Sequence, residues 1–281
     1  QRRQVKHQLT VAGGQLHRES GAPLGASGEH DCVAHCLDFL REMIKRTTTG
    51  SISAVICEPI QGTAGNIIPP SGWLSGLRAI TRELGAMLIS DEMITGFGRT
   101  GKMFGCDHEG VVPDIMTVGK GMAGGFPVSG VIAATEIAES KPFANPSGSS
   151  SSYGGNPLAS AAADAALSII LKERLVENAR VVGAALLKRL HEAMGRSPLI
   201  GAVRGRGLML GVDLVNPITR KPLEPAVCRQ VFDECLRRGL LTMSYNPALR
   251  INPPLTITHE EAMRGADILE ESLKAAAAGR F

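Results

Sequence analysis

Short apolar runs alternate along the chain with longer stretches of helical periodicity. The apolar runs are continuous and partly β-branched, which is typical of strands buried within a sheet. They lie at residues 52–57, 86–90, 114–118, 128–134, 208–214 and 249–252. The helical stretches lie at residues 31–46, 71–85, 156–194, 225–238 and 258–276. This alternation predicts an α/β fold with a doubly wound, mostly parallel central sheet flanked by helices.

Three of these helices begin with a capping signal. Ser71 is a candidate N-cap, because its hydroxyl can accept a hydrogen bond from the first helical turn. Asn156 directly precedes Pro157, a pair that is typical of a helix start. Thr258 and Glu261 have the spacing of a capping box. The sequence therefore predicts where each of these three helices begins.

The same patterns divide the chain into three parts. Residues 1–30 are polar and Gly-rich, and we expect them to be irregular. Residues 31–195 carry most of the strand and helix alternation and form the larger predicted domain. Residues 196–281 are predicted to form a smaller C-terminal α+β domain.

The composition is ordinary for a soluble globular protein. The chain has 281 residues, of which 43% are hydrophobic and 20% are charged. A net charge of +3 and an aromatic content of 4% are too low to indicate binding to nucleic acid or to a membrane surface. The apolar stretch at 158–171 contains Asp164 and is too short to span a bilayer. We therefore expect neither nucleic acid nor a membrane as a partner.

Cysteine usage points to a reducing compartment. The six cysteines are sparse for this length and form no CxxC pair, so we expect no disulfide framework and a cytoplasmic location. No apolar segment follows residues 1–4, so we expect no signal peptide. His30, Cys32, His35 and Cys36 lie close together and could bind zinc. The simpler interpretation is a helix start that carries small, buried thiols.

Charged residues follow three of the predicted strands directly. They are Glu58, the pair Asp91 and Glu92, and Lys120. In a doubly wound sheet the chemistry lies beyond the carboxyl ends of the strands. Lys120 stands between two glycines, so its amine is uncrowded and can approach a bound ring, as imine formation requires. A single strand-end charge would be solvated surface, but an acid and a lysine on neighbouring strand ends indicate a site.

Around these residues the sequence resembles the class III, pyridoxal-phosphate-dependent aminotransferases. The similar segments occur in the family's order at residues 58–62, 91–101, 113–121, 153–159 and 204–211. Together they place the resemblance over about residues 31–276. The resemblance implies a fold-type-I enzyme, with residues 31–195 as part of the cofactor-binding domain, and a homodimer with active sites at the subunit interface.

The resemblance also implies roles for residues near the cofactor. Lys120 is expected to form the Schiff base with pyridoxal 5′-phosphate and to act as the proton shuttle. Asp91 is expected to pair with the pyridine nitrogen, so that the ring can act as an electron sink. Met93 is expected to pack on the ring face. Ser152 stands where the family usually has a threonine that reaches the cofactor phosphate of the neighbouring subunit.

Two further residues are implied to bind substrate. Arg250 matches the arginine that clamps the substrate carboxylate, a task that suits its bidentate fork. Glu58 matches an acidic residue that, in some members, pairs with an active-site arginine and gates substrate choice. No metal is expected at this site. Ile94 departs from the family, which often has a glutamine there that hydrogen-bonds the cofactor's phenolic oxygen.

The larger departure from the family lies in the N-terminal part. The family carries a long stretch before the equivalent of residue 31, which supplies a phosphate-gripping turn and an aromatic that stacks on the ring. Residues 1–30 contain neither element, since the glycines at 13–14 have no hydroxyl residue beside them. We therefore expect a fragment or a shortened homologue.

The expected reaction is transfer of an amino group from an amino acid or amine to a 2-oxo acid. Two alternatives stay open from the sequence. One is decarboxylation-dependent transamination of 2,2-dialkylglycines, because residues 205–215 and the Arg250 segment are about as similar to that branch. The other is a non-catalytic homologue that acts as a binding subunit.

Overall fold

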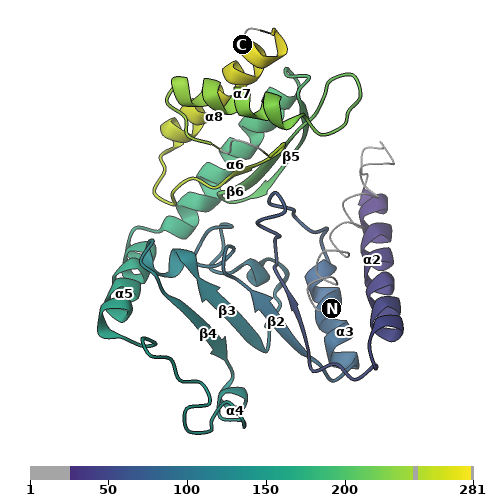
Figure 1. Cartoon of the computed structure of the whole chain (residues 1–281), viewed down its shortest axis with the longest axis vertical. Helices are drawn as coiled ribbons and strands as arrows, with labels where there is room; N and C mark the ends of the chain where they lie inside the picture. Colours follow the sequence, from purple (N-terminus) through teal and green to yellow (C-terminus); the bar gives the residue numbers. More distant parts are fainter. Residues whose placement is uncertain (1–25, 243–245, 280–281) are drawn as a thin grey trace.

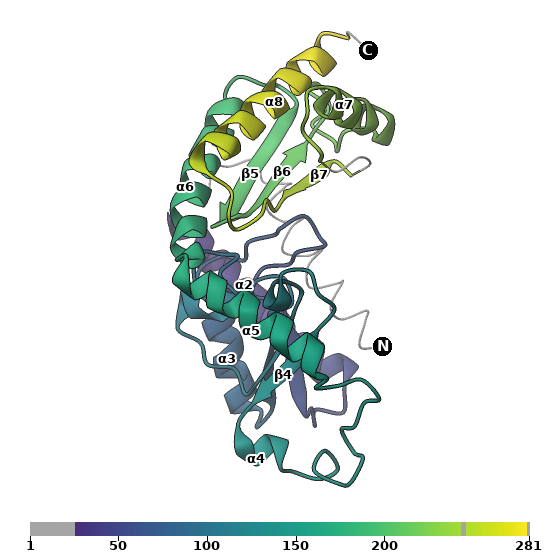
Figure 2. The same cartoon turned by 90° about the vertical axis from the view of Figure 1, so that its left-hand side faces the viewer.

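Two β-sheets, each packed against its own helices, make up the computed structural model (Figure 1), which describes residues 26–242 and 246–279. The first sheet has the strand order β1-β2-β3-β4, and the second has the order β5-β6-β7. Figure 2 shows the second sheet and its helices stacked at one end of the first.

The first sheet is parallel except at one edge. Its strands are β1 (Ala54–Cys57), β2 (Met87–Asp91), β3 (Ile115–Gly119) and β4 (Ser129–Ala133). β1, β2 and β3 pair in parallel, whereas β4 runs antiparallel to β3. The connection from β3 to β4 is too short for the crossover that a parallel pair needs. The mostly parallel sheet is thus confirmed, with an antiparallel edge strand.

Helices lie before, between and after the strands of the first sheet in the sequence. They are α2 (Ala26–Thr47), α3 (Trp73–Glu83), the 3-10 helices η1 (Gly105–Glu109) and η2 (Lys120–Ala123), α4 (Thr135–Ala138) and α5 (Pro157–Lys172). The expectation that residues 1–30 are irregular is wrong for residues 26–30, which form the first turn of α2. Residues 1–25 lie outside the described residues.

The packing of α3 shows how the predicted helix forms and where its predicted cap fails. Its buried Leu74, Leu77 and Ile80 face Leu88 of β2 in one apolar cluster. The predicted Ser71 cap is wrong, because Gly72 occupies the N-cap position with a φ of 92°. The carboxylate of Glu109 instead accepts from the backbone N–H groups of Gly72 at 3.2 Å and Ser75 at 2.9 Å. A residue distant in sequence therefore caps this helix.

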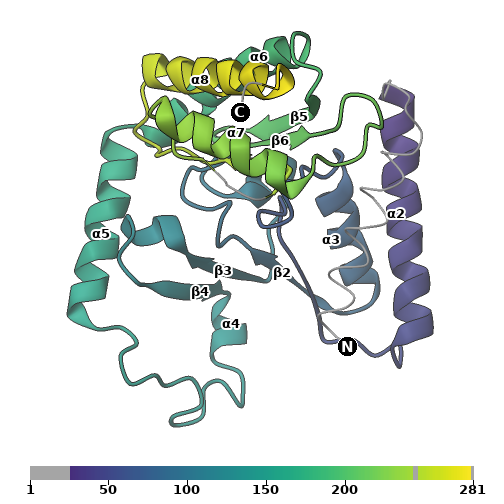
Figure 3. The same cartoon turned by 45° about the horizontal axis from the view of Figure 1, so that its top comes forward.

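The second sheet is antiparallel throughout and more completely covered. It consists of β5 (Ile200–Arg206), β6 (Met209–Leu214) and β7 (Ala248–Ile251). α6 (Leu175–Met194), α7 (Pro225–Arg237) and α8 (His259–Ala277) gather over one of its faces (Figure 3). β5 was not predicted, because its glycines and arginines interrupt any apolar run.

Two of the predicted helix starts are confirmed. Asn156 accepts from the backbone N–H of Ala159 at 2.9 Å. The Thr258 hydroxyl accepts from the Glu261 N–H at 3.2 Å, and Glu261 accepts from the Thr258 N–H at 2.9 Å. The predicted continuous helix at 156–194 is wrong, because Arg174 adopts a left-handed φ of 53° and separates α5 from α6.

The buried residues form one large cluster and two smaller ones. The large cluster surrounds the second sheet and includes residues of α6, α7 and α8. The domain boundary at residue 195 stays a prediction, although α6 packs on β5 and contributes to the C-terminal core. Within the described part of the chain, no helix has the length and apolar content that crossing a bilayer requires.

Candidate functional site

The carboxyl ends of β1, β2 and β3 meet at one edge of the first sheet. In register, Cys57 lies beside Ser90 and Asp91 lies beside Thr117. Glu58 and Lys120 directly follow β1 and β3. The structure therefore places Glu58, Asp91 and Lys120 on three neighbouring strand ends, where a doubly wound sheet puts its chemistry.

Asp91 is a half-buried carboxylate with a fixed orientation. Its Oδ1 accepts from the Thr117 hydroxyl at 3.2 Å and from the Met93 backbone N–H at 3.3 Å. The first bond joins β2 to β3, and the second closes the turn that follows β2. Both bonds hold the carboxylate in one orientation at the end of β2.

Glu92, the other acid at this strand end, has a structural role instead. It is fully buried and accepts hydrogen bonds from the hydroxyls of Ser90, at 3.1 Å, and Thr95. It also accepts from the backbone N–H groups of Gly105 at 2.7 Å and Cys106 at 2.8 Å. Successive strand residues point to opposite faces, so Asp91 and Glu92 diverge. These hydrogen bonds connect Glu92 to η1 and to the turn after β2.

Lys120 is exposed and lies in a sparsely populated backbone conformation. It begins η2 with a φ of 46°, which is uncommon for a residue with a side chain. Met93 lies beside it, because a Cβ added to Gly119 would come within 2.5 Å of the Met93 Cε. Gly119 therefore leaves room for the Met93 thioether next to Lys120.

The Glu58 turn packs against the segment after Asp91. Glu58 Oε2 accepts from the Gly62 N–H at 2.9 Å. A Cβ on Gly62 would lie 2.3 Å from Cδ1 of Ile94, so this glycine is needed for close contact. The contact brings Glu58 and the residues after β2 into one constellation.

Arg250 belongs to the second sheet but lies near a loop of the first. It is half-buried on β7, opposite Gly211 of β6. A Cβ on Gly211 would lie 2.5 Å from the backbone oxygen of Gly65, which is in the loop between β1 and α3. Among residues 26–242 and 246–279, no carboxylate lies within ion-pair range of the Arg250 guanidinium. Arg250 therefore has a charge available for an anionic ligand.

Ser152 is not brought to this edge within the same chain. It is exposed in the segment between α4 and α5, which extends away from α6 and the second sheet (Figure 1). Ala166, well along α5, is the part of that helix that lies near Gly124 of η2. The start of α5 at Pro157 is thus roughly 13 Å further along the helix axis.

Residues that link the two sheets were missed by the sequence analysis. Arg99 donates to the carbonyls of Leu208 and Pro253, and burial lowers the pKa of its guanidinium to about 10. Asn66 and Arg204 form a second link. Arg99 and Arg204 both lie in segments that resemble the family, but no local signal distinguishes Asn66.

The zinc alternative gains no support from the described residues. No group of three or more metal-ligating side chains occurs among those that the structure describes, and the side chain of His30 lies outside them. Burial first, and then the neighbouring Cys32, raise the pKa of the Cys36 thiol to about 11. This shift is the one expected of a small, partly buried thiol.

Known proteins share this fold and sequence pattern. The family "Aminotransferase class-III" matches residues 6–273. The match begins earlier than residue 31, the start that the sequence analysis gave to the resemblance. An amine transaminase structure from an uncultivated Pseudomonas species, in a PLP-bound form, is 37% identical with a TM-score of 0.80, and the alignment covers 89% of this chain and 57% of that one. An (S)-enantioselective omega-transaminase from Thermomicrobium roseum is 37% identical with a TM-score of 0.78, covering 89% and 56%.

Curated relatives include both aminotransferases and racemases. A putrescine aminotransferase of Pectobacterium atrosepticum is 35% identical over 96% of this chain and 60% of its own length. A leucine/methionine racemase of Thermococcus litoralis is 37% identical over 89% of this chain and 56% of its own length. The chain thus spans somewhat more than half the length of these two relatives. The predicted fold type I is confirmed, and the chain belongs to the class III aminotransferase family.

Proposed function

We propose that the protein transfers amino groups from an amino acid or amine to a 2-oxo acid, with pyridoxal phosphate held by Lys120. The observation that carries the proposal is the placement of Asp91 and Lys120 on the neighbouring ends of β2 and β3. An amine and a fixed carboxylate are the two groups that the chemistry needs on either side of the cofactor ring.

The residues present fit such a cofactor. When bound, pyridoxal phosphate supplies an aldehyde carbon and an electron-accepting ring. Lys120 is exposed and uncrowded, so it would hold the cofactor through its Nζ, and its free amine would carry a proton to or from the substrate Cα. Asp91, already oriented by Thr117, holds a proton on the pyridine nitrogen. Met93 supplies an apolar contact beside Lys120.

The substrate side of the proposal rests on Arg250 and Glu58. Arg250 has no ion-pair partner among the described residues, and its planar fork suits a carboxylate. Glu58 is half-buried at the neighbouring strand end and offers a negative charge to a cationic group of a different substrate. Arg250 would thus attract a substrate carboxylate, and Glu58 would attract a cationic substrate group.

The proposed site also includes Ser152 from a second subunit. Ser152 is exposed in the segment between α4 and α5, which extends away from α6 and the second sheet (Figure 1), so its hydroxyl is available to a partner molecule. We therefore propose a homodimer in which each Ser152 faces the other subunit's site.

Racemisation is a second candidate function, because two of the curated relatives are named as racemases of leucine/methionine and of alanine/serine. It requires the same lysine but no 2-oxo acid. Decarboxylation-dependent transamination and a non-catalytic binding subunit also remain as alternatives. Each alternative predicts a different product.

The test is a product assay of the cofactor-loaded protein with L-alanine, with and without 2-oxoglutarate. Transamination predicts repeated turnover to pyruvate and glutamate only when both substrates are present, and at most one pyruvate per site with L-alanine alone. D-alanine formed without 2-oxoglutarate would indicate a racemase, and carbon dioxide released from 2-aminoisobutyrate would indicate the decarboxylating branch.

Lys120→Ala should abolish turnover, and Lys172→Ala is the matched control because Lys172 is an exposed lysine at the end of α5. Wild-type turnover in Lys120→Ala would refute the assignment. A cofactor-loaded wild-type protein without any of these products would favour the binding subunit.

A further inference from the structure

We infer that Asn66 is a positioning residue that sets where Arg250 lies relative to Glu58, and so tunes recognition of the substrate carboxylate. This inference rests on the proposed function, because it assigns a task to the two residues that were proposed there to bind substrate. Within the described residues, the hydrogen bonds of the Asn66 side chain go to Leu210 and Asn252 rather than to Arg250 or Glu58. It acts through the loop between β1 and α3 and through the segment that ends β7.

Asn66 is a fully buried amide that joins the two sheets. Its Nδ2 donates to the backbone oxygen of Leu210 in β6 at 2.6 Å and to Oδ1 of Asn252 at 2.7 Å. Asn252 is the residue directly after β7 and lies two positions from Arg250. The two hydrogen bonds therefore connect the loop that begins at Glu58 to β6 and to the end of β7, the strand that carries Arg250.

The backbone of Asn66 is held as firmly as its side chain. The Arg204 guanidinium donates to the carbonyls of Gly65 at 2.7 Å and Asn66 at 3.1 Å, and pairs with both oxygens of Asp213 at 2.8 and 2.9 Å. Asn66 has a left-handed φ of 54°, a conformation that asparagine tolerates better than most residues. The loop consequently has one defined position against β5 and β6.

The same loop also packs against Gly211, the residue of β6 that pairs with Arg250. Gly211 pairs with Arg250, and it approaches the Gly65 oxygen so closely that a Cβ would lie 2.5 Å away. At its other end the same loop begins with Glu58, whose carboxylate accepts from the Gly62 N–H at 2.9 Å. A single short segment therefore spans the distance between the two proposed substrate-binding residues.

One further detail marks Asn66 as more than a packing residue. Its Oδ1 is buried without a hydrogen-bond partner among the described residues. An apolar or smaller residue would avoid that cost, so the amide is retained at the expense of an unsatisfied acceptor. The benefit lies in the two bonds from Nδ2, which fix the second sheet over the first.

The test is Asn66→Gly, because glycine tolerates the left-handed backbone while the side chain and its amide are removed. Thr63→Ala, an exposed position in the same loop, is the control. We expect Asn66→Gly to raise KM for alanine about tenfold, as loss of a buried hydrogen bond to the carboxylate-binding strand implies. We expect kcat, and KM for isopropylamine, which has no carboxylate, to change less than about twofold.

Calorimetric titration with propionate gives a readout that needs no turnover. We expect the dissociation constant to rise about tenfold in Asn66→Gly and to stay unchanged in Thr63→Ala. Equal values for wild type and Asn66→Gly would overturn the inference, as would an equal loss for alanine and isopropylamine. If wild type binds no propionate but turns over isopropylamine, the inference fails and the proposed function stands. If wild type binds propionate without any turnover, the proposed function fails instead.

Discussion

The two sheets differ in how completely their faces are covered. The β5–β7 sheet lies under three helices and belongs to a continuous cluster of buried residues. The β1–β4 sheet has an exposed face in the described chain, where Ile56 is 43% exposed, Met87 40% and Val131 60%. Asp91, Met93 and Lys120, the cofactor residues proposed within one subunit, lie in this first sheet or directly after its strands. The more completely buried unit carries Arg250, whereas the more open unit carries Asp91 and Lys120, to which we assign the chemistry.

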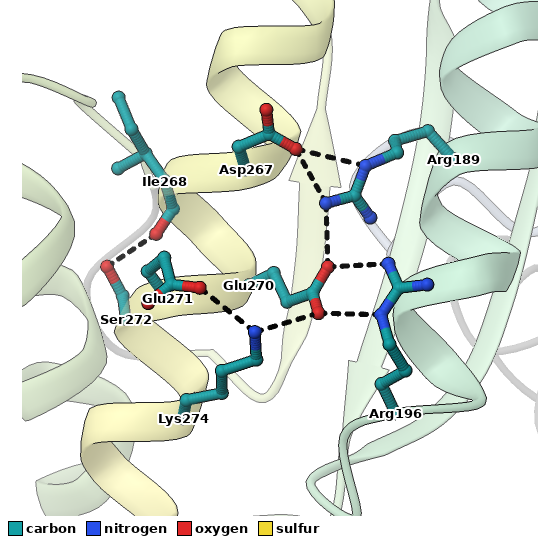
Figure 4. Close-up of polar contacts among 8 residues, drawn as sticks. All are labelled: Arg189, Arg196, Asp267, Ile268, Glu270, Glu271, Ser272 and Lys274. Atoms are coloured by element: carbon teal, nitrogen blue, oxygen red, sulfur yellow. Dashed lines mark hydrogen bonds and ion pairs between the residues drawn. The ribbon is translucent and has the colours of Figure 1, made fainter.

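A network of ion pairs joins the helices of the second unit. Figure 4 shows Glu270 of α8 between Arg189, Arg196 and Lys274, with Arg196 donating to both of its oxygens at 2.8 Å. The Glu270 side chain is only 3% exposed, yet three cations compensate its charge. Hydrogen bonds from Arg196 and the neighbouring cations hold the pKa of Glu270 well below its usual range, and burial opposes them. This network fastens α8 to α6 and to the residues that follow α6.

The largest expected effect tests the contrast in core packing. Leu273 in α8 is fully buried and Leu158 in α5 is 67% exposed, so the same substitution probes both regions. Leu273→Ala should lower the free energy of unfolding by about 2–5 kcal/mol, because it leaves a cavity. Leu158→Ala should change it by less than about 0.5 kcal/mol. Denaturant titration measures both values, and equal costs would contradict the comparison.

The next effect concerns the ion-pair network. Glu270→Gln should cost about 1.5–3 kcal/mol at pH 7, since it removes charge-assisted hydrogen bonds from a buried group. Glu271→Gln is the control, because that carboxylate is 54% exposed and its ion pair within the described part of the chain is with Lys274.

The pH dependence of this difference has a defined sign. A depressed carboxylate pKa stabilises the protein above the unfolded pKa of about 4.3 and loses this contribution as the pH falls toward the folded value. The difference between wild type and Glu270→Gln should therefore be constant near neutral pH and shrink in acid. A difference that grows below pH 4 would contradict the role of the network.

The smallest expected effect on the free energy of unfolding lies where the two regions meet. Arg250→Ala should raise KM for carboxylated substrates by a factor that corresponds to about 1.5–3 kcal/mol, the value of a charge-assisted hydrogen bond. The free energy of unfolding should stay close to that of wild type, since Arg250 has no ion-pair partner among the described residues. Unchanged KM values would remove Arg250 from the site.

Local patterns predicted the elements that local patterns determine. The strands ending at Cys57, Asp91 and Gly119 are continuous apolar runs, and the caps at Asn156 and Thr258 use side chains within the same turn. The sequence analysis therefore placed the proposed cofactor residues at neighbouring strand ends before the register was known.

The features that escaped prediction depend on distant contacts. Glu109 caps α3 from another segment, so Ser71 was the wrong candidate. β5 forms because β6 offers it hydrogen-bond partners, although Arg204 and the neighbouring glycines break its apolar pattern. Asn66 acquires its partners only when the two sheets meet. None of these contacts has a signal at short sequence separation.

The most direct test of the central claim is an absorbance titration of the protein with pyridoxal phosphate, beside Lys120→Ala. The account predicts a visible band from cofactor joined to Lys120 in wild type, and its loss in the variant, with unchanged unfolding in denaturant. The same band in both proteins, or none in either, would contradict the claim that the strand ends of the first sheet form a cofactor site on Lys120.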